Sequence, residues 1–221
     1  RKRQSVLSWK NWGSFEMKIY DISQKYDSKM INYPSLNRFE QKFLRHYETG
    51  YDMCLSQLIL PMHVGTHLDA PYHFIKGGQK INEFDMQLFY GSCQVMEIEE
   101  KVIDISALRK KVIKYERILF KTGNSKLMEN NEFNEGYSYI GRSGAEYLVK
   151  QGVKLVGIDY FSVDASQDKE KIAHKILLGA GVVLLEAINL SAVDEGEYTI
   201  SCFPLNIEGS EASPCRAVLI K

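Results

Sequence analysis

The stretch Val182–Ile188 limits most strongly what this chain can fold into, because it is apolar enough for a buried strand yet contains a carboxylate. Glu186 interrupts the run of valine, leucine and isoleucine residues. A buried carboxylate is destabilising unless it is paired with a cation or bound to a metal ion. The sequence therefore predicts a central strand whose end meets cationic groups or a metal that other segments help to hold.

One such group is His174, twelve residues before Glu186. It lies in an expected helix over residues 168–178, which Gly179 and Gly181 end. A lone histidine among apolar helix residues is most simply a hydrogen-bonded boundary residue. Together with Glu186 and further ligands, however, it would complete an imidazole–carboxylate half of a metal site.

The further ligands are concentrated in the segment His63–Phe74, which holds three of the chain's five histidines. The candidate ligand residues of this segment are His63, His67, Asp69 and His73. Imidazole and carboxylate are the ligand set for zinc and its first-row neighbours. Gly65 and Pro71 oppose a long helix, and in an extended chain positions 67 and 69 project to the same side. Two imidazoles and a carboxylate leave a position open for water, so the segment predicts a hydrolytic metal site.

The remaining pattern predicts a mixed-sheet α/β fold. Strands are expected at residues 17–23, 53–62, 92–99, 117–122, 154–158, 182–188, 198–203 and 216–220, and helices at 105–115, 143–150 and 168–178. Ser143 and Glu146 form a capping-box pattern at the start of the second helix. The polar stretch 124–139 is expected to be a surface insertion, mobile or lid-like.

A resemblance to a known family rests on the motif His63-x-Gly65-Thr66-His67-x-Asp69-Ala70-Pro71-x-His73-Phe74. This motif resembles that of the cyclase-like metal-dependent hydrolases, which include bacterial kynurenine formamidase (arylformamidase) and isatin hydrolase. Shorter matches are Gly157-Ile158-Asp159, Ser162-Val163-Asp164, the spacing of His174 and Glu186, and Ser213-Pro214-x-Arg216-Ala217-Val218. The likeness covers about residues 17–221.

The resemblance implies a single compact domain with a mixed β-sheet and a few covering helices, of the swivelling β/α kind, usually assembled as a homodimer. It also implies one or two divalent metals, zinc or manganese. By motif position, His63 and His67 would hold the first metal and Asp69 would contact or bridge both. His174 would bind the second metal, and Glu186 would bridge.

Two residues would act on the substrate. His73 resembles a proton-transferring histidine rather than a ligand, and Tyr33 stands where the formamidases carry an aromatic substrate contact. Asp159, Ser162 and Asp164 would either orient the ligands or cap the helix that carries His174.

The implied activity is hydrolysis of a small amide, above all an N-formyl aryl amine such as N-formylkynurenine, by hydroxide on the metal with His73 moving the proton. One alternative is ring opening of a cyclic amide of the isatin kind, or of a lactone. Another is a metal-dependent ligand-binding protein without turnover, which would not need His73 as a base. Ser35-Leu36-Asn37 stands where the formamidases often carry a Gly-Asp-x-Pro run, and the motifs that carry the resemblance do not extend to the polar stretch 124–139.

The charge balance and the cysteines of the sequence indicate which kinds of partner and which cellular compartment to expect. The 28 basic and 28 acidic residues cancel, which argues against nucleic acid and anionic membranes as partners. The most apolar run, Ile176–Leu185, is much shorter than the roughly 20 residues that span a bilayer. Residues 1–16 lack the apolar run of a signal peptide, so they are interpreted as an N-terminal extension outside the hydrolase domain. Four scattered cysteines without a Cys-x-x-Cys pair indicate free thiols and a cytoplasmic location.

Overall fold

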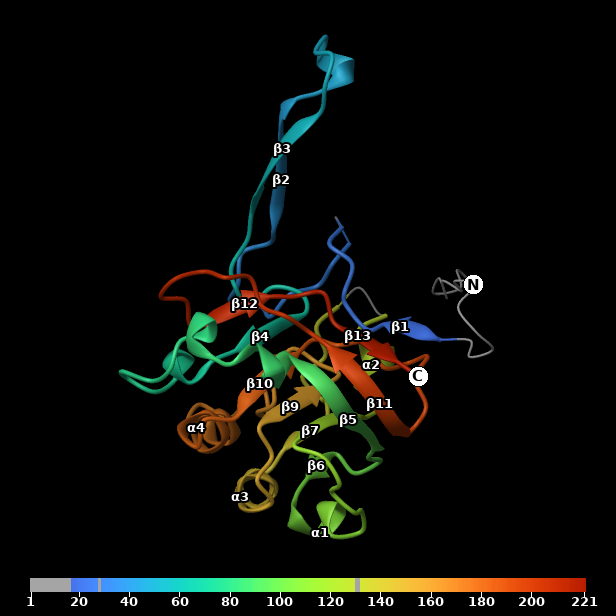
Figure 1. Ribbon diagram of the computed structural model, residues 1–221, viewed down its shortest axis with the longest axis vertical. Helices are drawn as coiled ribbons and strands as arrows, with labels where there is room; N and C mark the ends of the chain where they lie inside the picture. The colour runs from blue at the N-terminus through green and yellow to red at the C-terminus, as the bar shows by residue number, and fades with distance from the viewer. Residues whose placement is uncertain (1–16, 28, 130–131) are drawn as a thin grey trace.

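A nine-stranded mixed sheet runs through the molecule, in the order β1-β13-β11-β5-β7-β9-β10-β4-β12 (Figure 1). The computed structural model describes residues 17–27, 29–129 and 132–221, so the expected extension at 1–16 lies outside the described residues. The strands of this sheet are β1 (Ile19–Asp21), β4 (His67–Asp69), β5 (Tyr90–Glu97), β7 (Arg117–Lys121), β9 (Leu155–Ile158), β10 (Val183–Glu186), β11 (Gly196–Ser201), β12 (Ala212–Pro214) and β13 (Val218–Ile220).

Four short α-helices and two small strand pairs complete the fold. The helices are α1 (Ile105–Leu108), α2 (Asn124–Leu127), α3 (Arg142–Lys150) and α4 (Ile172–Gly179). The small pairs are β2 (Glu40–Arg45) with β3 (Leu55–Ile59), and β6 (Val102–Ile103) with β8 (Tyr139–Ile140). Single 3-10 turns cover Tyr47–Thr49, Pro71–His73, Ile81–Glu83 and Met86–Phe89. In the described part of the chain, no helix is long and apolar enough to cross a membrane.

The centre of the sheet consists of the strands with the most apolar sequences. β5, β7, β9 and β10 run parallel to their neighbours in this series, and every residue of β9 and β10 is buried. Parallel strands covered on both faces have near-continuous apolar sequences, which is why these strands could be predicted.

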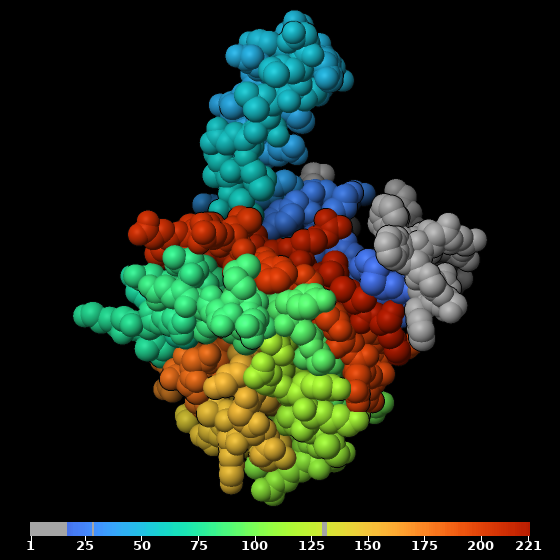
Figure 2. All heavy atoms as spheres, viewed as in Figure 1, coloured from blue at the N-terminus to red at the C-terminus, as the bar shows by residue number. Residues whose placement is uncertain are grey.

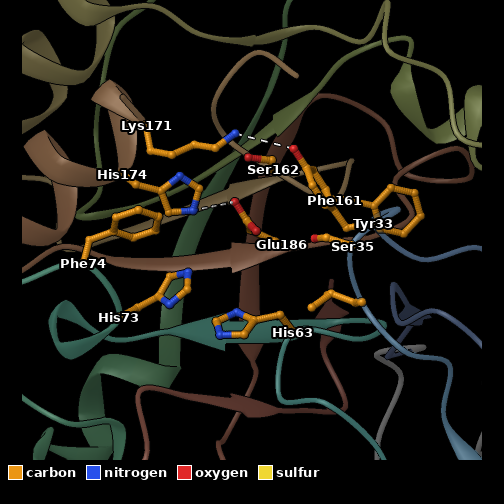
Figure 3. Close-up of a pocket in the computed structure, with 11 residues that line it drawn as sticks. Tyr33, Ser35, His63, His73, Phe74, Phe161, Ser162, Lys171, His174 and Glu186 are labelled. Atoms are coloured by element: carbon orange, nitrogen blue, oxygen red, sulfur yellow. Dashed lines mark hydrogen bonds and ion pairs between the residues drawn. The ribbon is translucent and has the colours of Figure 1, made fainter. Parts of the chain in front are cut away.

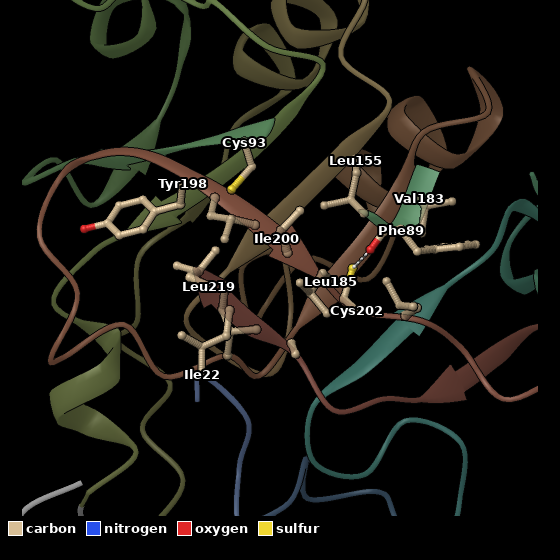
Figure 4. Close-up of a cluster of buried hydrophobic side chains, with 14 of the residues drawn as sticks. Ile22, Phe89, Cys93, Leu155, Val183, Leu185, Tyr198, Ile200, Cys202 and Leu219 are labelled. Carbon is tan, nitrogen blue, oxygen red and sulfur yellow. Dashed lines mark hydrogen bonds between the residues drawn. The ribbon is translucent and has the colours of Figure 1, made fainter. Parts of the chain in front are cut away.

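Each face of the sheet packs against its own core. On one face, α1, α3 and α4 cover a cluster that includes Phe120, Ile158 and Leu184. On the other face, the sheet curls around a second cluster, where Leu219 of β13 and Leu68 of β4 join the central strands (Figure 4). The molecule is thus a single compact α/β domain with a curled mixed sheet and few helices, as predicted.

The hairpin of β2 and β3 projects away from this body (Figures 1 and 2). We call residues 40–59 the arm. Every residue of its two strands is exposed. The sequence predicts β3 but neither β2 nor the projection, because the mixed polar and apolar residues Glu40–Arg45 give no clear strand alternation.

Two helix predictions require correction. The helix expected at 105–115 ends at Leu108, and Val112 is 71% exposed instead of packing on the sheet. The chain turns because Lys111 N–H donates to the carbonyl of Leu108, and Gln94 Nε2 then donates to the carbonyl of Val112. The predicted capping box is also wrong: Gly141 is the N-cap of α3, and Ser143 Oγ accepts from the N–H of Ile105 instead.

The stretch 124–139 is not a detached surface insertion. Asn124, Ser125 and Tyr137 are buried. Asn124 exchanges two hydrogen bonds with the backbone of Ser138, and the hydroxyl of Tyr137 donates to the carbonyl of Asp164. These inward bonds anchor both ends of the stretch, around Asn124 and Tyr137, to the body of the protein.

Candidate metal centre

The pairing of β4 with β10 places three of the predicted ligands on one face of the sheet. In this antiparallel pair Glu186 is opposite His67, and Leu184 is opposite Asp69. Opposite residues of two strands project to the same face, and so do residues two apart on one strand. His67, Asp69 and Glu186 therefore converge on the helix-covered face, at the end of the most apolar strand.

The turn before β4 requires glycine. Gly65 has a φ of 70°, and a Cβ there would lie 2.8 Å from Met30 Cε and from the hydroxyl of Tyr26. Its carbonyl accepts a hydrogen bond of 2.9 Å from His67 Nδ1. This bond fixes the tautomer of His67 and leaves Nε2 free to bind a cation.

Thr66 joins the two halves of the site. Its hydroxyl donates to the carbonyl of Ala187 at 2.7 Å and accepts from the N–H of Gln24 at 2.8 Å. Since Ala187 directly follows Glu186, Thr66 ties the histidine segment to the end of β10. The threonine of the motif is therefore a positioning residue.

Helix α4 brings His174 over the same face. His174 Nε2 lies 3.5 Å from Asp69 Oδ2 and 3.4 Å from Glu186 Oε1. Its Nδ1 contacts Asp164 Oδ2, and Asp164 also accepts from the N–H of Ala173 at 2.6 Å. Asp164 thus both caps the helix and orients the imidazole. The sequence left these two roles open as alternatives, and Asp164 has both.

His63 and His73 complete the cluster from the other side. His63 Nδ1 lies 2.8 Å from Asp69 Oδ1, and Nε2 lies 3.5 Å from Glu211 Oε1. The rings of His63 and His73 are tilted by 31° with centroids 4.1 Å apart. Ligand atoms of His63, Asp69 and His73 lie within 4.8 Å of one another, so His73 is close enough to serve either as a ligand or as a proton carrier.

The polar atoms at the centre of this cluster have the pattern expected of a cation site. His67 Nε2 and both carboxylate oxygens of Asp69 are buried, and none makes a well-formed hydrogen bond to another described residue. Imidazole nitrogens of His63, His67 and His174 face the carboxylate at 2.8, 3.3 and 3.5 Å. Buried polar atoms gathered in this way without well-formed hydrogen bonds would be costly in a structure without a cation between them. His67, Asp69 and Glu186 form a second candidate ligand group, which shares Asp69 with the first. The residues therefore fit one or two divalent cations.

The pKa values of the cluster show the same negative field. Burial lowers the pKa of His67, but Asp69 and Glu186 raise it to about 9. Burial disfavours the charged form of His174. Glu186 and Asp164 favour that form, and the pKa of His174 is raised well above its usual value. Burial raises the pKa of Asp69, but His63 and His67 hold it well below its usual range. A field that retains protons on two buried imidazoles also attracts metal cations.

A pocket opens directly above the cluster (Figure 3). Its lining residues are Tyr33, Ser35, Leu36, His63, His73, Phe74, Phe161, Ser162, Lys171, His174 and Glu186. Tyr33, which the resemblance gives as a substrate contact, is among the residues that line the pocket. Phe74, Phe161 and Lys171 were not predicted, because their side chains carry no signal in the sequence that separates a pocket wall from ordinary packing.

Asp159 plays no part in orienting the ligands. Its carboxylate accepts from the hydroxyls of Thr122 and Ser125, at 2.6 and 2.9 Å, and so anchors the start of α2. Ser162 lines the pocket, and its hydroxyl accepts from the N–H of Asp164 at 3.2 Å. Of the three residues expected to orient ligands, only Asp164 contacts one.

Comparison with known proteins decides the family. The family model described as "Putative cyclase" matches residues 20–165, about two thirds of the chain. The chain belongs to the cyclase family. Cyclase-like protein 1 of Arabidopsis thaliana is 32% identical over 217 residues, covering 92% of this chain and 85% of the relative. The kynurenine formamidase of Bacillus cereus is 30% identical over 205 residues, covering 90% and 95%.

A solved structure supports the same assignment. "The structure of predicted metal-dependent hydrolase from Bacillus stearothermophilus" aligns with a TM-score of 0.79 at 27% identity, covering 92% of this chain and 98% of that one. This cyclase-family protein therefore has the fold that the resemblance of its first motif implies.

Proposed function

We propose that this protein is a metal-dependent hydrolase of small amides, and that its substrate is an N-formyl aryl amine such as N-formylkynurenine. The observation that carries the proposal is the set of buried atoms on His67 and Asp69 that make no well-formed hydrogen bond to a described residue and lie within a group of imidazoles and carboxylates. The names of two similar proteins, a kynurenine formamidase and a metal-dependent hydrolase, support the reaction class.

The residues of the site divide the work. His63, His67, Asp69, His174 and Glu186 would hold one or two divalent cations, zinc or manganese. A bound cation supplies Lewis acidity to the substrate carbonyl and lowers the pKa of a water to about 7. Tyr33, Phe74 and Phe161 provide aromatic walls for an aryl group.

In this proposal His73 moves the proton. Burial lowers its pKa to about 4; Asp69 raises the pKa, while His63 and His174 lower it. The imidazole is therefore neutral at pH 7 and able to accept a proton from the attacking water. It returns the proton to the leaving nitrogen as the carbon–nitrogen bond breaks, and the products are formate and an aryl amine. Such transfer contributes about 10²–10⁴ in rate.

A hydrolysis screen tests this proposal. The protein is stripped with a chelator, reloaded with zinc or manganese, and assayed on N-formylkynurenine, isatin and a simple lactone. We expect hydrolysis of N-formylkynurenine only after reloading. Activity on isatin or the lactone alone would favour ring opening, and bound metal with no turnover on any compound would favour a ligand-binding protein.

The variant His73→Ala distinguishes the two roles considered for His73, proton carrier and metal ligand. We expect it to keep its metal, measured by mass spectrometry, and to lose at least ~100-fold in kcat. Loss of the metal instead would make His73 a ligand.

We further propose that the protein works as a homodimer joined through the arm. Large apolar side chains of the arm are 44–64% exposed: Phe43, Leu44, Tyr47, Tyr51, Met53, Leu55, Leu58 and Ile59. An isolated two-stranded hairpin is only marginally stable in water, and so many exposed apolar residues in one segment indicate a protein partner.

Light scattering after size exclusion tests the assembly. We expect the wild type to have twice the mass of one chain, and the double variant Phe43→Glu with Leu58→Glu to be monomeric. Met86→Glu, which changes an equally exposed apolar residue outside the arm, should remain dimeric. A monomeric wild type would refute the assembly.

We also propose a cytoplasmic location, which the free thiols of the four cysteines support. Recovery of the protein in a secreted or periplasmic fraction would refute it.

A further inference from the structure

One cationic side chain in the pocket has no place in the mechanism above. Lys171 is the one lysine among the lining residues of the described chain, and no arginine lies among them. Its Nζ lies 3.5 Å from the hydroxyl of Tyr33 and 5.7 Å from the centroid of the Tyr33 ring. Figure 3 shows it at the end of the pocket away from His63 and His73.

No carboxylate neutralises this ammonium group at close range. In the described ranges, no ion pair within 4.0 Å joins Lys171 Nζ to an acidic residue. Asp168 interacts with Lys171 through its charge, but its oxygens accept from the backbone N–H groups of Glu170, Lys171 and Ile172. The charge of Lys171 is therefore available to a ligand in the pocket.

The backbone at Lys171 is unusual in a way that points to the side chain. Lys171 has a φ of 53° and is one of two described non-glycine residues in the left-handed region; the other is Ala187, next to Glu186. Glycine adopts this conformation without strain, whereas a side chain is disfavoured there. Residues held in this way cluster at functional sites, so the lysine itself needs an explanation.

The pocket thus has two chemically different ends joined by apolar walls. His63 and His73 lie at one end and Lys171 lies at the other, with the candidate ligands His174 and Glu186 between them. Phe74 and Phe161 line the space between them. A ligand that suits all three parts has an amide at one end, a flat apolar body, and an anionic group at the other end.

We propose that Lys171 is a specificity-determining residue, which binds an acid group of the substrate, so that the substrate class is the anionic aryl amides. The inference rests on the proposed amide hydrolysis and deepens it. An alternative role for Lys171 is purely structural: its contact with Tyr33 would only hold that loop in place.

Paired substrates separate the two roles. The probes are the N-formyl derivatives of 2-, 3- and 4-aminobenzoate, which carry a carboxylate at graded distances from the amide, and formanilide, which is neutral. We expect Lys171→Met to lower the ratio of kcat/KM for the best anionic probe to that for formanilide at least ~10-fold, mainly through KM. Lys171→Arg should restore most of the ratio.

The matched control is Lys175→Met. It removes the same charge from the exposed side of the same helix and should leave the ratio as in the wild type. Lys171→Gly guards against a folding defect, because glycine suits the φ at this position; we expect its melting temperature to equal or exceed that of the wild type, with the ratio lost. Equal losses on anionic and neutral probes in Lys171→Met would overturn the inference and leave the structural role.

A binding measurement makes the test independent of turnover. Fluorescent 2-aminobenzoate is titrated into the chelator-stripped protein, where its carboxylate has no metal to bind. We expect Kd to rise at least ~10-fold in Lys171→Met, and equal Kd values would overturn the inference. If the reloaded wild type hydrolyses no formyl compound while this Kd shift is seen, the proposed function fails and the anion site at Lys171 stands.

Discussion

Replacement of Asp164 by asparagine tests whether His174 is a metal ligand, because it changes the group that contacts His174 Nδ1. Asp164 accepts from His174 Nδ1 and from the N–H of Ala173, so it fixes the imidazole with Nε2 toward Asp69 and Glu186. An amide offers only one acceptor oxygen, and its NH2 group would face the Nδ1 proton. In Asp164→Asn the imidazole therefore loses its acceptor or changes tautomer, which puts a proton on the metal-binding nitrogen.

The size of the effect follows from this geometry. Loss of a partner that orients a histidine ligand typically weakens metal binding about 10–100-fold. That range corresponds to about 1.4–2.7 kcal/mol. A competition titration between the stripped protein and a fluorescent zinc chelator measures it directly, without any assumption about the substrate.

Asp168→Asn is the matched control, because Asp168 accepts from backbone N–H groups just before α4 and no hydrogen bond joins it to His174 in the described chain. We expect it to lower the melting temperature while zinc affinity stays within about twofold, a change well below that of a lost ligand partner. Equal zinc affinity of Asp164→Asn and the wild type would show that His174 is not a ligand. Equal losses in both variants would show that the helix cap, rather than the imidazole, controls the affinity.

Three further predictions concern the same centre. Glu186→Gln should retain less metal by mass spectrometry, because Glu186 faces His67 and His174; unchanged metal content would make it a structural residue. Chelation should lower the melting temperature, since a cation at 100 times its Kd stabilises by about 2.7 kcal/mol; identical calorimetric transitions with and without metal would contradict a bound cation. Gly65→Ala should cost at least about 1–2 kcal/mol in urea unfolding, because its φ is 70° and the added Cβ meets Met30 and Tyr26; a loss within about 0.5 kcal/mol, the usual range of surface substitutions, would contradict the strain.

The sequence predicts which candidate ligands lie together where a residue type alone restricts its surroundings. Glu186 in an apolar strand had to meet cations, and the structure brings His67 and His174 to it. His63 and Asp69 lie in the same cluster, although more than a hundred residues separate the two segments. These contacts could be predicted because unpaired buried charges and clustered imidazoles have few stable arrangements.

The errors arise where a partner distant in the sequence overrides local pattern. Ile105 to Val112 has helical spacing, yet Gln94 of β5 donates to the carbonyl of Val112 and the helix ends at Leu108. Ser143 has the sequence pattern of a helix cap, yet its hydroxyl accepts a hydrogen bond from the N–H of Ile105 in another helix. Lys171 is an ordinary surface residue by sequence, and neither its place in the pocket nor its left-handed backbone conformation is encoded by a pattern.

The origin of each residue explains why the metal chemistry is better defined than the substrate. His67, Asp69 and Glu186 are fixed by strand register, and His174 by a helix whose cap also holds its ring. Several residues that line the pocket come instead from connecting segments, among them Tyr33, Phe161 and Lys171. Connecting segments vary among relatives while the sheet beneath them is retained. A relative at 30% identity therefore says more about the candidate metal ligands than about the residues that line the pocket. The substrate of this protein must therefore be inferred from its own pocket residues. Among them, Lys171 is the one whose charge favours a ligand with an acid group.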